Sequence, residues 1–176
     1  MFFILIALWI VTVILLYADW RTESTRWAAL VTFAGGLGGL AETIVDTVKP
    51  FLSQSGILTH SANKILDVVF SLSYFGTHIA GPYFYIVFTI CYCSFFRRRT
   101  IRLLKAVLLV PVLCMLFITP FNPVMSINFR ILSIWAVPYI FTGSALLIRC
   151  YIKENNRQIK RNKLFVVIAA VFPVIQ

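Results

Sequence analysis

The chain has few charged residues, and acidic ones are the scarcest. Only 12% of its 176 residues are charged, and six acidic side chains stand against sixteen lysines and arginines. A soluble domain carries about 25% charged residues, so this sequence lacks the polar surface that a globule in water requires. With 60% hydrophobic residues and a mean hydropathy of +0.90, the composition predicts a membrane protein whose apolar exterior is solvated by lipid.

Motifs for catalysis, metal binding and nucleic-acid binding are also lacking. The sequence contains neither His-Glu-x-x-His nor Gly-x-Ser-x-Gly, and no Lys-Ser/Thr pair follows the glycines at 35–39 to make a phosphate loop. Cys91, Cys93, Cys114 and Cys150 lack the spacing of a tetrahedral metal site, so we expect free thiols. The basic residues that give the net charge of +10 occur in short clusters between apolar runs, which is typical of the segments that flank membrane spans. We therefore expect no catalytic residue, metal, cofactor or nucleic-acid partner.

Six apolar stretches predict an all-α fold, a single polytopic bundle of transmembrane helices over residues 1–176. About 20 apolar residues are needed to cross about 30 Å of hydrocarbon. The last stretch stops at Gln176 after thirteen residues, so we expect a truncated final span. The predicted spans are residues 2–18, 27–45, 65–96, 103–119, 131–148 and 164–176.

The basic residues predict an orientation in the cell membrane. With six spans and the N-terminus outside, thirteen of the sixteen lysines and arginines lie in cytoplasmic loops. Positive residues in short loops are retained on the cytoplasmic side, so this multi-pass orientation is favoured. Splitting the 65–96 stretch at Gly81-Pro82 and moving the N-terminus inside gives the same division of charge. Two spans would each fall short of about 20 residues, which favours one long helix.

Glycine and proline residues indicate where helices bend and where they approach closely. Gly76, Gly81 and Pro82 interrupt the third stretch and predict a hinge, because proline lacks the N–H that its helix position requires. Gly35 and Gly39 form a small-xxx-small pair, which lets two helix backbones come together in lipid. We expect this pair to pack within the chain, and it also suits a homodimer.

Four ionisable residues within or beside the spans form a candidate signal site. Glu42 and Asp46 are four residues apart, and Asp67 and His78 are eleven apart, so each pair shares a helix face. Ionisable groups in a membrane are costly and usually face a cavity or a partner, which predicts a site for a ligand, ion or proton. The alternative is that the acids are solvated at the water boundary and that His78 only bonds a neighbouring helix.

Two segments resemble the membrane-embedded N-terminal region of bacterial sensor histidine kinases. They are Tyr17–Trp27 with the glycines at 35–39, and residues 157–163 with the apolar span reaching Phe172-Pro173. The resemblance implies a signal-transduction region of a two-component system, whose phosphoacceptor histidine and ATP-binding part lie in a separate cytoplasmic domain. No such motif occurs in this chain, so it is not a kinase by itself.

The number of spans agrees with a missing cytoplasmic domain. Six spans leave the C-terminus outside, and a cytoplasmic domain would need one more crossing. A transporter fragment or small transporter subunit, with Glu42, Asp67 and His78 along a path, is one alternative. A non-catalytic membrane partner that binds through its glycines is the other. No convincing internal repeat supports a transporter.

Overall fold

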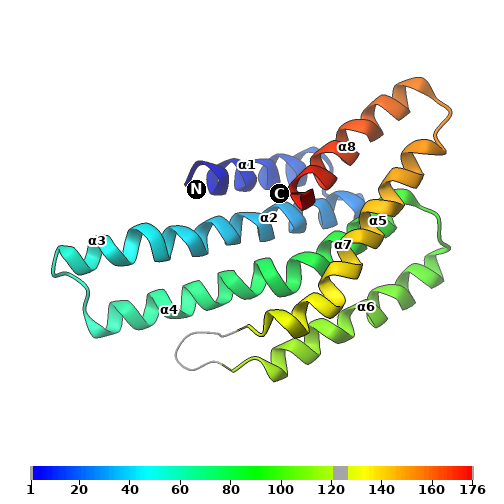
Figure 1. Ribbon diagram of the computed structural model, residues 1–176. Helices are drawn as coiled ribbons and strands as arrows, with labels where there is room; N and C mark the ends of the chain where they lie inside the picture. The colour runs from blue at the N-terminus through cyan, green and yellow to red at the C-terminus, as the bar shows by residue number, and fades with distance from the viewer. Residues whose placement is uncertain (1, 121–126, 176) are drawn as a thin grey trace.

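The computed structural model describes residues 2–120 and 127–175, and this part of the chain forms six continuous helices without a strand (Figure 1). The predicted all-α fold is thus confirmed. The first two helices are α1 (Phe2–Asp19) and α2 (Glu23–Thr43), which continues through the π-helical η1 (Ile44–Val48) into α3 (Lys49–Gln54). The third combines α4 (His60–Phe75), the π-helical η2 (Gly76–Ala80) and α5 (Gly81–Cys93). The last three are α6 (Arg98–Ile118), α7 (Phe129–Ile152) and α8 (Arg157–Ile175).

Short polar side chains begin several of these helices by capping their free N–H groups. The hydroxyl of Thr59 accepts from the backbone N–H of Ala62 at the start of α4, at 3.2 Å. The side chain of Asn128 does the same for Arg130 at the start of α7, at 3.1 Å. Each cap satisfies an N–H that has no partner within its own helix and so fixes where the chain turns.

The third apolar stretch forms one helix over residues 60–93. The backbone stays right-handed helical at Phe75 and at Gly81, on either side of η2, so the chain does not turn at Gly81-Pro82. It leaves the helix only at Ser94, which has the left-handed conformation with φ 52°. At about 1.5 Å per residue, such a helix is about 50 Å long, well beyond the hydrocarbon thickness.

Most helices extend further than the predicted spans. The second span was placed at residues 27–45, whereas the helix runs from Glu23 to Gln54. Arg98, Arg99 and Arg102 belong to the first turns of α6 rather than to a loop. The reason is that helical backbone hydrogen bonds do not depend on hydropathy, so a helix continues past the apolar run that identifies it.

α5 is the central helix of the bundle. Its buried side chains include Tyr83, Ile86, Val87 and Ile90, and they form one core with Met115 of α6 and further residues of α7. A second cluster joins α5 to the second half of α7 through Leu147 and Cys150, with α8 packed alongside. The central helix is therefore enclosed by its neighbours.

Three helices are long and apolar enough to cross a membrane by length and composition. They are Glu23–Gln54, Arg98–Ile118 and Phe129–Ile152, and α1 contributes a shorter apolar helix over Phe3–Asp19. Large apolar side chains stand exposed on their outer surfaces, for example Phe117 at 84% and Phe141 at 66%. This distribution suits a lipid solvent and supports the prediction of a membrane protein.

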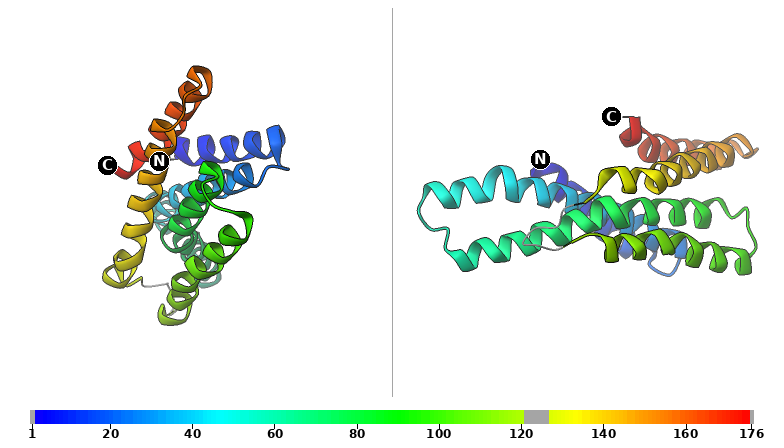
Figure 2. Two further views of the ribbon diagram at one scale, coloured as in Figure 1. Left: turned by 90° about the vertical axis from the view of Figure 1, so that its right-hand side faces the viewer. Right: turned by 60° about the horizontal axis from the view of Figure 1, so that its bottom comes forward.

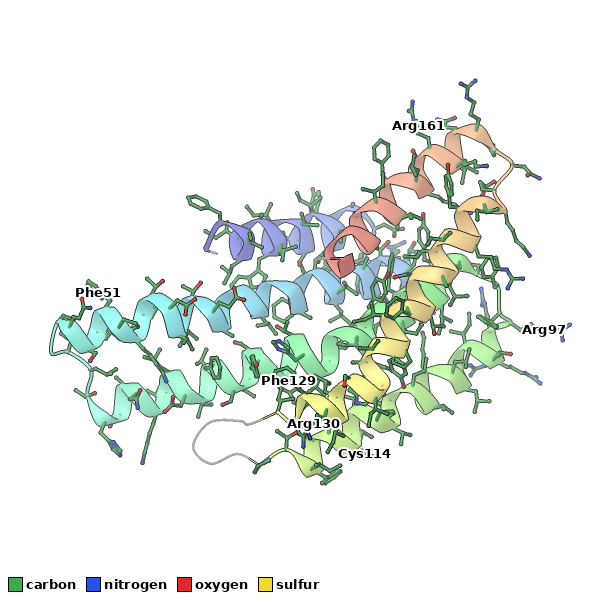
Figure 3. The ribbon with its side chains drawn as sticks, in the orientation of Figure 1. Phe51, Arg97, Cys114, Phe129, Arg130 and Arg161 are labelled. Atoms are coloured by element: carbon green, nitrogen blue, oxygen red, sulfur yellow. The ribbon has the colours of Figure 1, made fainter. Side chains whose placement is uncertain are left out.

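The helices run alternately in opposite directions, which gathers most of the basic residues at one end of the molecule. Figure 3 shows Arg97 and Arg161 at one end of the molecule and Phe51 at the other. We call the end with the connections at 20–22, 94–97 and 153–156 the basic end. The opposite end is the hairpin end. At the hairpin end η1, α3 and the first half of α4 extend beyond α1, α6 and α7 (Figures 1 and 2). We call this part the projecting hairpin.

Candidate functional site

Several polar groups inside the bundle form hydrogen bonds between helices. The hydroxyls of Thr12 on α1 and Thr32 on α2 lie 2.7 Å apart. Tyr85 on α5 and Ser144 on α7 share a hydrogen bond of 3.0 Å between their hydroxyls. Such bonds hold lipid-embedded helices together where the hydrophobic effect gives no drive for association. These residues therefore stabilise the bundle and are not candidates for a ligand site.

The structure separates the four predicted signal residues into different settings. Asp67 is buried, only 6% exposed, and pairs with Lys49 across the projecting hairpin. Asp46 lies in η1 and is exposed, as is Glu42 two residues before η1. The Asp67 carboxylate is thus already neutralised by a lysine, which gives it a structural partner. Lys49 was missed from the sequence because the second span was taken to end at residue 45.

His78 lies in η2 and is half-buried. Its Nδ1 is 3.2 Å from the carbonyl oxygen of Tyr74, and the two rings are 4.1 Å apart between centroids. The ring of Phe129 at the start of α7 meets the imidazole edge-on at 5.8 Å. Glu42 acts on His78 electrostatically from the neighbouring helix. Glu42 and His78 are therefore the two predicted residues that the fold brings near each other.

η2 packs against the glycines of α2. The hydroxyl of Thr77 lies 2.8 Å from the carbonyl oxygen of Ala34 and 3.1 Å from that of Ser73. A Cβ added at Gly38 would come within 3.0 Å of the Thr77 methyl carbon, and one at Gly76 within 2.5 Å of Leu37. The two helices thus approach closely here because neither has a side chain in the way.

Gly35 and Gly39 face α1 rather than η2. A Cβ at Gly35 would lie 3.2 Å from Leu8, and one at Gly39 would lie 3.1 Å from Leu5. Gly36 is tighter still, because a Cβ there would come within 2.3 Å of the Trp9 ring. The small-xxx-small pair therefore packs within the chain, while its use in a homodimer stays a prediction.

The predicted hinge coincides with η2. Gly76 begins the π-helical segment, and Gly81 and Pro82 follow it in the first turn of α5. π-helical turns inside α-helices are rare and are frequent at functional sites. An apolar cavity of about 620 Å³ borders the same place, lined by Thr77, Gly81 and Pro82 and by residues of α1, α2, α7 and α8. The cavity therefore gives the side chains at η2 space in which to change their packing.

Metal-ligand clusters do not occur in the described residues. No three His, Cys, Asp or Glu side chains gather there in a way that could hold an ion. The cysteines are free thiols, and Cys93 and Cys150 are buried between α5 and α7. No family model, curated protein or solved structure matches the chain. The site is accordingly interpreted from its own residues.

The ion pair between Lys49 and Asp67 predicts an asymmetric response to mutation. Lys49→Met leaves the buried Asp67 carboxylate without a partner and should lower the free energy of unfolding by about 3 kcal/mol. The double variant Lys49→Met/Asp67→Leu removes both charges and should recover most of that loss. Thermal unfolding in detergent measures both effects. Asp46→Asn, at an exposed position of the same hairpin, is the matched control and should leave the unfolding temperature unchanged. A Lys49→Met variant as stable as this control would contradict the assignment.

Proposed function

We propose that the chain is the membrane-embedded sensing region of a signalling receptor, with η2 as its moving joint. The observation that carries the proposal is the single helix 60–93, which joins the projecting hairpin to the buried core through a π-helical segment. A receptor needs two arrangements whose balance a signal can bias. A π-helical turn followed by Gly81-Pro82 is suited to that purpose, because Pro82 supplies no backbone N–H and the π-helical turn interrupts the regular α-helical hydrogen bonding.

The joint lies between two rigid parts. On one side the Lys49–Asp67 ion pair ties α3 to α4, so the projecting hairpin moves as a unit. On the other side α5 is buried among α2, α6 and α7, and it is bonded to α7 through Tyr85 and Ser144. A change of packing at η2 would therefore tilt the hairpin relative to the bundle. His78 within η2 and Glu42 on the neighbouring helix are the residues at which a ligand, ion or proton would bias that change.

The proposed topology has six crossings, a cytoplasmic basic end and an external N-terminus. Thirteen of the sixteen basic residues lie on the connections and helix ends of the basic end, which is the distribution that cytoplasmic retention of positive charge produces. Lys105 is one of these residues. Its ammonium pairs with Glu23 and lies 5.2 Å from the centre of the Trp27 ring. The amphipathic tryptophan suits the membrane–water boundary.

The output we propose is the cytoplasmic domain of a sensor histidine kinase. This part of the proposal rests on the resemblance of residues 17–27 and 157–163 to such receptors. The geometry favours signalling over transport, since Asp67 is neutralised by Lys49 and does not join Glu42 and His78 along one path. A non-catalytic membrane partner would present its glycines to another protein, whereas Gly35 and Gly39 face α1.

Cysteine labelling tests the topology. In a background with the four native cysteines changed to alanine, Ser55→Cys reports the hairpin end and Asn155→Cys the basic end, both in exposed connections. A membrane-impermeant maleimide added to intact cells should label Ser55→Cys and leave Asn155→Cys unmodified until the cells are opened. Labelling of Asn155→Cys in intact cells would contradict the proposed orientation.

Phosphorylation of the native product tests the proposed output. An antibody against the 55–59 connection should detect a protein larger than the 20.1 kDa of this chain. In isolated membranes with ATP, that protein should acquire acid-labile phosphate, as phosphohistidine is. A native product of 20.1 kDa that takes up no phosphate would remove the kinase proposal and favour a small membrane partner.

Substituting Pro82 tests the joint in the same assay. Pro82→Ala restores a backbone N–H and allows a regular helix, so the balance of the two arrangements and the phosphate level should change severalfold. Pro111→Ala is the matched control, because Pro111 also lies inside a helix, in α6, outside the helix that contains η2. Equal phosphate levels in the wild-type protein and in the Pro82→Ala variant would contradict a role for η2.

A further inference from the structure

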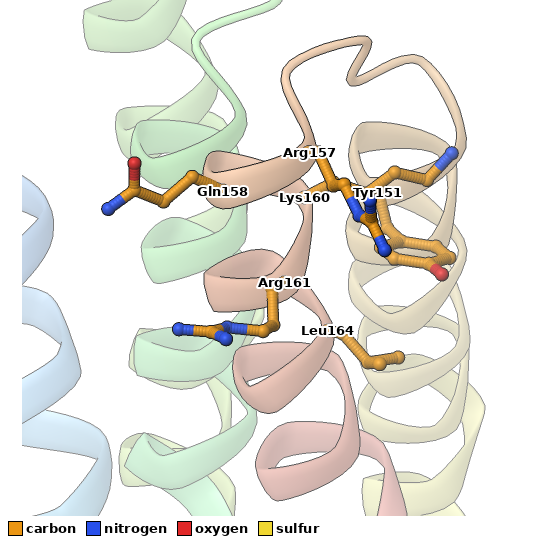
Figure 4. A pocket seen from close by; sticks show the side chains of 6 residues that line it. All are labelled: Tyr151, Arg157, Gln158, Lys160, Arg161 and Leu164. Atoms are coloured by element: carbon orange, nitrogen blue, oxygen red, sulfur yellow. The ribbon is translucent and has the colours of Figure 1, made fainter.

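A basic cavity lies at the corner between α7 and α8. It has a volume of about 630 Å³ and is lined by Tyr151 near the end of α7 and by residues from the first two turns of α8. Figure 4 shows the Arg157 and Lys160 side chains beside the Tyr151 ring. The α8 residues that line it are Arg157, Gln158, Lys160, Arg161 and Leu164.

The three cations of this cavity have no acidic partner among the described residues. All six acidic residues of the chain fall within those residues, and three of them are paired with Lys49, Lys105 and Lys163. The Lys160 ammonium instead lies 5.3 Å from the centre of the Tyr151 ring. Arg157, Lys160 and Arg161 thus concentrate positive charge around a hollow that contains no carboxylate.

The corner itself is held by its own hydrogen bonds. Lys163 pairs with Glu154 at 2.6 Å, and this hydrogen bond holds the pKa of the Glu154 carboxyl below its usual range. The side chain of Asn156 accepts from the backbone N–H of Gln158 at 3.0 Å and so caps α8. The N–H groups that begin α8 therefore have a partner already, and an anion in the cavity would be bound by the side chains.

An apolar surface continues below the cations on the same side of α8. Arg157, Arg161, Leu164 and Ile168 are spaced by three or four residues, which places them on one helix face. Leu164 is 37% exposed and Ile168 is 52% exposed. The face thus changes from three cations to exposed aliphatic side chains along the direction in which α8 enters the proposed bilayer.

We infer that the α7–α8 corner binds one anionic phospholipid, its phosphate among Arg157, Lys160 and Arg161 and an acyl chain along Leu164 and Ile168. Arginine guanidinium groups bind phosphate oxygens through paired hydrogen bonds, and lysine adds a compact charge. Basic pockets between helices on the cytoplasmic side recognise anionic head groups in the same way. A free phosphate ion would use the cations but leave the apolar face uncovered, so the match of both parts favours a lipid.

Native mass spectrometry of the full chain in detergent, titrated with phosphatidylglycerol, measures this binding. The triple variant Arg157→Gln/Lys160→Gln/Arg161→Gln should lower the affinity for the first bound lipid by about tenfold or more. The variant Arg97→Gln/Arg98→Gln/Arg99→Gln is the matched control, because it removes the same charge from the basic end at another connection. It should lower that affinity by less than about twofold, since it leaves the α7–α8 corner intact.

Additional measurements distinguish a lipid phosphate from free phosphate and test whether the variants keep their fold. Phosphatidylcholine should bind much more weakly than phosphatidylglycerol, and inorganic phosphate at the same concentration should not displace the lipid. The single exposed substitution Arg161→Gln should give a smaller loss in the same direction, with helix content unchanged by circular dichroism. Equal losses in the two triple variants would overturn the site, and so would displacement by inorganic phosphate.

Discussion

The fold depends on the need to satisfy the polar groups of its central helix without water. The helix 60–93 carries serines, threonines, tyrosines and His78 into the interior of a bundle whose outside is apolar. Each such group needs a hydrogen-bond partner, on its own helix or on another, since an unsatisfied polar group in hydrocarbon costs several kcal/mol. Thr77 reaches the backbone of α2, Tyr85 reaches Ser144 and Tyr83 reaches the backbone of α6, and these bonds fix which helices lie side by side.

The same helix has different surroundings along its length. Its second half is enclosed by α2, α6 and α7, while its first half packs against the α2–η1–α3 helix, meets Phe129 of α7 through Tyr74, and extends past the rest of the bundle (Figures 1 and 2). η2 lies at the change from one setting to the other. A segment that interrupts the regular α-helical hydrogen bonding lies there, between the buried core and a hairpin held by one buried ion pair, which is the arrangement that the proposed signalling role requires.

The positions of the helices were predictable from the sequence, and their ends were not. Apolar runs located all six, and length alone favoured one helix over two at residues 60–93. The ends were missed because a helix continues through polar residues such as those at 46–54, where hydropathy carries no signal. The Lys49–Asp67 pair was missed for the same reason, since it exists only if both helices extend beyond the apolar run.

The candidate site was predictable in part. Gly76, Gly81 and Pro82 marked the place where the structure has η2, although nothing in their spacing distinguishes a π-helical turn from a bend. Gly35 and Gly39 indicated a close helix contact but not that α1 supplies the other side, because small residues carry no information about their partner. The cavity at the α7–α8 corner was not predicted, as it depends on where α7 ends relative to α8.

The distance between the projecting hairpin and the bundle tests the central claim most directly. Spin labels at Ser55→Cys on the hairpin connection and at Ser133→Cys on α7, both exposed positions, would report it by electron paramagnetic resonance in lipid nanodiscs. If η2 is a joint with two arrangements, the wild-type chain should give two populations of distances and the Pro82→Ala variant one. One narrow distribution, the same in both proteins, would show a rigid connection and contradict the account.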